Sequence, residues 1–61
     1  MGYMILEYET TAGGLVVIEG QSVKYWTGEG LPTFAGDLEG LAEMFPKVME
    51  ELLTKGIVKR T

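Results

Sequence analysis

The side chains that most often carry out catalysis or bind metals are scarce in this sequence. It contains neither Cys nor His, so zinc sites and most acid–base or thiol chemistry lack their usual residues. Ser22 is the only serine; it falls in a predicted tight turn, and no His is present to activate it. We therefore predict no catalytic residue, no bound metal and no cofactor, and a protein that is not an enzyme.

Two groups of residues leave a binding alternative open. Glu7 and Glu9 fall on one face of a predicted strand and could contact a cation together, although two solvated charges are the simpler interpretation. The segment 28–36 contains three glycines, whose backbone N–H groups can approach an anion. Position 33 is Thr, where a dinucleotide fingerprint has its third glycine. The alternative is a small ligand- or ion-binding protein that uses the 28–36 loop.

The charge and hydropathy of the chain exclude two further classes of partner. Five basic and nine acidic residues give a net charge of −4, which is the wrong sign for neutralising nucleic-acid phosphates. No run of the sequence approaches the roughly 18 apolar residues of a membrane span. We expect a cytoplasmic protein with no direct nucleic-acid or membrane partner. An acidic inhibitor of a nucleic-acid-binding enzyme is a further alternative.

The length predicts one domain, residues 1–61, that needs a partner. A 61-residue chain seldom buries enough apolar surface to fold with margin, and natural chains of this size add disulfides, a metal or an oligomeric interface. Disulfides need Cys and structural zinc sites need Cys or His, and the sequence contains neither residue. We therefore expect a homodimer or higher homo-oligomer, with another small protein as the other partner considered.

Alternating and β-branched residues predict three antiparallel strands, at 3–10, 15–18 and 23–27. Gly20 occupies the first central position of a two-residue loop, where a type II′ turn requires positive φ. That turn predicts five facing pairs: Glu19–Ser22, Ile18–Val23, Val17–Lys24, Val16–Tyr25 and Leu15–Trp26.

A helical apolar pattern follows the strands. Asp37 is a good N-cap, and the apolar stripe comprises Leu38, Leu41, Phe45, Val48 and Leu52. Pro46 interrupts the stripe and predicts either one kinked helix or two short helices that meet there. Gly56 suits a Schellman ending with Ile57. Residues 57–61 are either a short strand or a basic tail. The predicted fold class is α+β: a three-stranded antiparallel meander followed by one long amphipathic helix (β-β-β-α).

Both faces of the predicted sheet are largely apolar, although one helix covers only one face. The second face would carry Leu15, Val17 and Trp26, together with Ile5, and large aromatic residues often anchor interfaces. Met44 and Met49 widen the helical stripe beyond the need of one sheet face. The predicted interface residues are Ile5, Leu15, Val17, Trp26, Met44 and Met49. For Trp26, packing against the glycine loop or the C-terminal segment is an equal alternative.

The segment from Tyr25 to Leu53 resembles the N-terminal domain of HicB-type antitoxins and their small orphan relatives. The matching order is an aromatic strand end, Gly30-Leu31-Pro32, Gly36-Asp37-Leu38-Glu39 and a Leu-rich acidic helix. The chain departs from the family pattern at Thr33, after Asp37 and at Gly40. The resemblance implies an oligomerising sheet-plus-helix module whose fuller members bind a small toxin ribonuclease and carry a separate DNA-binding domain. Sixty-one residues are too few for that second domain.

Overall fold

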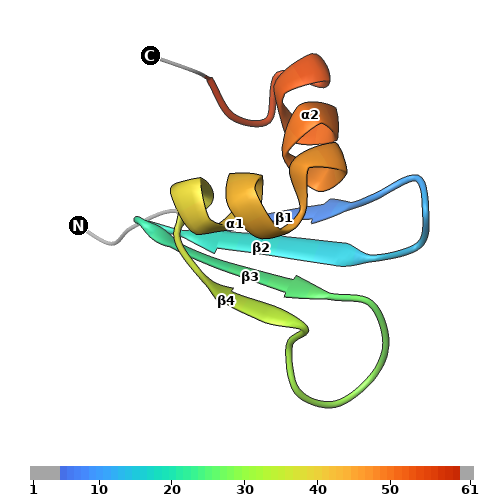
Figure 1. Cartoon of the computed structure of the whole chain (residues 1–61). Helices are drawn as coiled ribbons and strands as arrows, with labels where there is room; N and C mark the ends of the chain where they lie inside the picture. Colours follow the sequence, from blue (N-terminus) through green and yellow to red (C-terminus); the bar gives the residue numbers. More distant parts are fainter. Residues whose placement is uncertain (1–4, 60–61) are drawn as a thin grey trace.

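The computed structural model describes residues 5–59, which form an α+β fold with one four-stranded antiparallel sheet and two helices (Figure 1). The strands are β1 (Ile5–Glu9), β2 (Leu15–Glu19), β3 (Ser22–Trp26) and β4 (Phe34–Gly36), and they are neighbours in that order. The predicted α+β class and meander are confirmed, but the prediction of three strands and one helix is wrong. The first predicted strand began at Tyr3, and residues 3 and 4 lie outside the described residues.

The register predicted from the Gly20 turn is confirmed at all five pairs between β2 and β3, from Leu15–Trp26 to Glu19–Ser22. Gly20 has φ +61°, the positive value that the turn requires. Because side chains alternate along a strand, this register puts Val16, Ile18, Val23 and Tyr25 on one face of the sheet.

The three glycines and the proline of segment 28–36 predict a loop, with a brief extended piece at 32–35 as an option, whereas the structure has strand β4 at Phe34–Gly36. Phe34 pairs with Tyr25, and the Phe34 ring lies against Gly36 and Gly40. A Cβ added at those two glycines would meet the ring at 2.9 and 3.0 Å. The glycines therefore make room for the ring, which also lies 6.1 Å, centroid to centroid, from the ring of Phe45.

The helical stripe is divided into α1 (Leu38–Met44) and α2 (Pro46–Thr54). Asp37 caps α1 as predicted, accepting a hydrogen bond from the Gly40 backbone N–H at 2.8 Å. Phe45, with φ −136° and ψ +69°, is not helical, because a following proline disfavours the helical conformation of the preceding residue. Of the two alternatives predicted at Pro46, the structure has two short helices and not one kinked helix.

Helix α2 ends as the sequence predicts. The Ile57 backbone N–H donates to the Leu52 carbonyl at 2.9 Å, and the Gly56 N–H donates to the Leu53 carbonyl at 3.1 Å. With Gly56 at φ +76°, these are the two bonds of a Schellman motif. Residues 57–59 form no strand, so the C-terminal strand is not present there; residues 60 and 61 lie outside the described residues.

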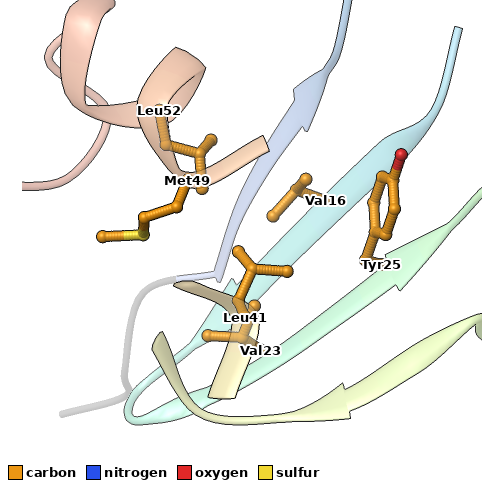
Figure 2. Close-up of a cluster of buried hydrophobic side chains, with 6 residues drawn as sticks. All are labelled: Val16, Val23, Tyr25, Leu41, Met49 and Leu52. Carbon is orange, nitrogen blue, oxygen red and sulfur yellow. The ribbon is translucent and has the colours of Figure 1, made fainter. Parts of the chain in front are cut away.

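Both helices lie on the same side of the sheet (Figure 1), and the core forms between that side and the apolar stripe of the helices. The Tyr25 and Phe45 rings pack edge to face, with their centroids 5.1 Å apart. Figure 2 shows the six buried hydrophobic side chains, which come from β2, β3, α1 and α2: Val16, Val23, Tyr25, Leu41, Met49 and Leu52. The core therefore uses only one face of the sheet.

Candidate functional site

The face of the sheet turned away from both helices has no cover within residues 5–59, and we call it the open face. Strand alternation and the observed register define its members. They are Ile5, Leu15, Val17, Trp26 and Ala35, which are apolar, and Glu7, Glu9, Glu19, Ser22 and Lys24, which are polar.

The apolar side chains of the open face are neighbours on adjacent strands. Leu15 pairs with Trp26 across β2 and β3, and Val17 is the next residue of β2 on the same face. Ile5 is 56% exposed and Leu15 37%, while Val17 and Trp26 are half-buried. Leu15, Val17 and Trp26 are therefore contiguous, and Ile5 lies diagonally across from Val17, so the four side chains form a patch bordered by charged residues.

Trp26 is held at one edge of this patch by the loop that joins β3 to β4. Its indole N–H donates to the Gly30 carbonyl at 3.0 Å. The Thr33 N–H donates to the Tyr25 carbonyl at 2.7 Å, and the Thr27 and Thr33 hydroxyls lie 2.8 Å apart. Trp26 thus contacts the glycine loop, as one of the two interpretations predicts, and its side chain lies on the open face; its role as an interface anchor stays a prediction.

A shallow hollow of about 420 Å³ lies beside Trp26. Its lining residues come from the two loops that flank the ends of β2 and β3: Gly13, Leu15, Trp26, Gly28, Glu29 and Gly30. At the loop tip, Leu31 is 90% exposed. The hollow therefore borders the open face at Leu15 and Trp26.

The two predicted methionines lie apart from the open face. Met44, at the end of α1, is 65% exposed, whereas Met49 is only 9% exposed and belongs to the core. Met49 lies on the same buried side of α2 as Leu52 and belongs to the same hydrophobic cluster. We therefore do not retain Met49 among the interface residues, and Met44 lies on the helical side of the molecule.

Sequence reasoning missed a polar contact that joins α2 to β1 and its following loop. The Tyr8 hydroxyl donates to the Glu51 carboxylate at 2.5 Å. The same carboxylate accepts from the Thr11 backbone N–H at 2.9 Å and from the Thr11 hydroxyl at 3.2 Å. We call these three residues the Glu51 latch. Tyr8 and Glu51 are 43 positions apart in the chain, so only the tertiary structure brings them together.

The latch shifts the pKa of both of its acids. The hydrogen bond from Tyr8 lowers the pKa of Glu51, and the Thr11 bonds and Lys55 act in the same direction while desolvation opposes them. The hydrogen bond to Glu51, with desolvation and the Glu51 charge, raises the pKa of Tyr8. The phenol therefore remains the donor and the carboxylate the acceptor of this hydrogen bond, which connects α2 to β1.

We expect Glu51→Gln to lower the melting temperature at neutral pH and to lose this effect in acid. A carboxylate whose pKa is depressed on folding stabilises the protein above its unfolded-state pKa, and this contribution disappears as the pH falls through the folded-state pKa. In thermal melts from about pH 7 down to about pH 3, the melting temperatures of the wild type and the variant should therefore converge as the pH falls. Glu50→Gln, at an exposed neighbouring position, is the control; parallel curves for Glu51→Gln and the wild type would contradict the assignment.

The described residues hold no group of three or more acidic side chains placed to bind a metal ion. Within the same range, neither helix has the length and apolar character that crossing a bilayer requires. The fold and its site thus define a small α+β domain with one open sheet face. No protein family, curated protein or solved structure matches this chain.

Proposed function

We propose that this protein is a small, non-catalytic interaction module that self-associates through the open face. One observation carries the proposal: Ile5, Leu15, Val17 and Trp26 form a continuous apolar patch on the side of the sheet that no helix covers. A patch of this kind, edged by charged residues, is typical of an interaction site.

The size of the chain supports self-association over a solitary monomer. Among residues 5–59, six hydrophobic side chains are buried in the core, and small domains bury a smaller fraction of their surface than larger ones do. Covering the open face with a second copy would remove further apolar surface from water, at about 25 cal/mol per Å². The second copy is the simplest partner because it is present wherever the protein is.

An antitoxin-like role is the biological setting that we propose for this module. The resemblance of residues 25–53 to HicB-type antitoxins supports it, through the order of the Gly30-Leu31-Pro32 loop, the capped Asp37 helix start and the acidic helix. In that setting the protein would bind a second small protein in addition to itself.

Trp26→Ala is expected to weaken self-association by more than about 1 kcal/mol, because the substitution removes the largest side chain of the open face. Sedimentation equilibrium or light scattering across a dilution series would measure the change. Leu15→Lys should have the same effect without touching the indole hydrogen bond to Gly30, and Leu31→Lys on the exposed loop tip is the matched control. Equal masses for the wild type, Trp26→Ala and Leu15→Lys at every concentration would exclude the open face as the interface.

The hollow beside Trp26 favours a second candidate function, the binding of a small ligand by the 28–36 loop. Gly28, Glu29 and Gly30 line it together with the indole ring. A ligand that binds only the folded chain raises its melting temperature in proportion to the logarithm of ligand concentration. Thermal melts with divalent cations and with nucleotides would separate the two functions, because self-association responds to protein concentration instead.

A further inference from the structure

We propose that two copies pack open face to open face about a twofold axis that runs parallel to the strands, midway between the two faces and over Val17. In this arrangement Glu7 of each copy faces Lys24 of the other. The inference rests on the proposed function and adds to it a partner, a symmetry and a pair of contacts.

The register supplies the geometry. Glu7 pairs with Val17, and Val17 pairs with Lys24, so the three residues form a straight row across β1, β2 and β3. Adjacent strands lie about 4.8 Å apart, which puts Glu7 and Lys24 at equal distances on opposite sides of Val17. Both charged residues are exposed, and they are free to meet groups on a facing surface.

A twofold axis along β2 exchanges the β1 and β3 sides of the row. Each copy then presents Lys24 where the other presents Glu7, and the contact forms twice in one dimer, as an isologous interface requires. Packed sheets cross at about −30°, a displacement that flexible Lys and Glu side chains can follow. The Glu7–Val17–Lys24 row is therefore complementary to its own copy.

The two copies could also be related by a twofold axis that lies between the faces but runs perpendicular to the strands, along the Glu7–Val17–Lys24 row. That axis would bring Glu7 against Glu7 and Lys24 against Lys24, and like charges across an interface are unfavourable. Charge thus selects one of the two symmetric ways to stack this face on itself.

In the neighbouring row, Leu15, like Val17, lies beneath the axis and meets its own copy. Glu9, Leu15 and Trp26 form this row, so Trp26 of each copy faces Glu9 of the other. Glu9 is exposed at the end of the edge strand β1, where its carboxylate can turn to solvent while the ring covers its methylene groups. Glu19 also meets its own copy; this like-charge contact is at the end of β2 next to the Gly20 turn, where the side chains can reach solvent. The apolar centre and the two Glu7–Lys24 contacts together define the interface.

Charge exchange tests the arrangement. Glu7→Lys or Lys24→Glu alone puts like charges at both contacts, and each variant should self-associate about tenfold more weakly than the wild type. An equimolar mixture of the two variants restores opposite charges at both contacts of the mixed dimer. Sedimentation equilibrium at equal total concentration should therefore find the mixture within about threefold of the wild-type affinity.

The controls separate this inference from the proposed function. Glu43→Lys and Lys47→Glu make the same charge changes on exposed helical positions, and mixing them should change nothing. One outcome would overturn the proposed axis and leave the proposed function standing. In that outcome the wild type self-associates and Trp26→Ala weakens the association, but the mixture of the Glu7 and Lys24 variants associates no better than either variant alone. A wild-type chain that remains monomeric up to millimolar concentration overturns both. Circular dichroism of each variant confirms that it is folded.

Discussion

Leu41→Ala is expected to cost about 2 to 5 kcal/mol of folding free energy. Leu41 is fully buried at the centre of the core between α1 and the sheet, so the shortened side chain leaves a cavity with few means of closing. A domain of this length is typically stable by about 3 to 9 kcal/mol. The variant should therefore be largely unfolded, or melt more than about 10 °C below the wild type.

Urea unfolding followed by circular dichroism would measure the loss. All samples need one protein concentration, because self-association adds to the apparent stability. Leu31→Ala provides the control: it deletes the same atoms from a side chain that is 90% exposed, and it should shift the urea midpoint very little. Similar midpoints for the two variants would mean that Leu41 is not a core residue.

Gly14→Ala is expected to destabilise the fold by about 1 to 3 kcal/mol through overpacking. A Cβ at Gly14 would lie 2.8 Å from Tyr25 Cε1, 2.9 Å from the Trp26 carbonyl oxygen and 3.2 Å from Thr10 Oγ1. The Gly14 N–H also donates to Thr10 Oγ1 at 2.8 Å. The added methyl group thus pushes against a buried ring and against backbone, neither of which can move without disturbing the β1–β2 loop.

Gly28→Ala is the matched control for this substitution. A Cβ at Gly28 has no atom within 4 Å, and Gly28 is not among the glycines with positive φ. The same methyl group should be tolerated there, with a melting temperature close to that of the wild type. Equal destabilisation by the two substitutions would show that loss of glycine flexibility, and not the close approach at Gly14, is responsible.

The Gly14 contact joins the fold to the open face. The atoms that a Cβ would meet include the ring of Tyr25, on the core side of β3, and the backbone carbonyl of Trp26, whose side chain lies on the open face. A small shift of β3 at this point would move the Trp26 ring relative to Leu15. We therefore expect any folded population of Gly14→Ala to self-associate more weakly than the wild type.

Local rules in the sequence were sufficient for the elements whose ends are set by one or two residues. Gly20 determined the β2–β3 turn and through it the complete register, because a two-residue loop admits only one set of facing pairs. Asp37 and Gly56 determined where the helical segment begins and ends, because their cap bonds involve residues only a few positions away. The open face follows from the same register, since alternation puts Leu15, Val17 and Trp26 together.

Only the tertiary structure decided the features that depend on distant residues. Phe34 joins the sheet as β4 because its ring fits against Gly36 and Gly40 while its backbone pairs with Tyr25. Pro46 is compatible with either a kinked helix or two separate helices. The break occurs at Phe45, which is not helical and whose ring packs against Tyr25 and Phe34. Glu51 reaches Tyr8, 43 positions away in the chain. Local spacing determines turns, caps and faces, whereas the packing of side chains far apart in sequence determines which of the locally allowed arrangements is adopted.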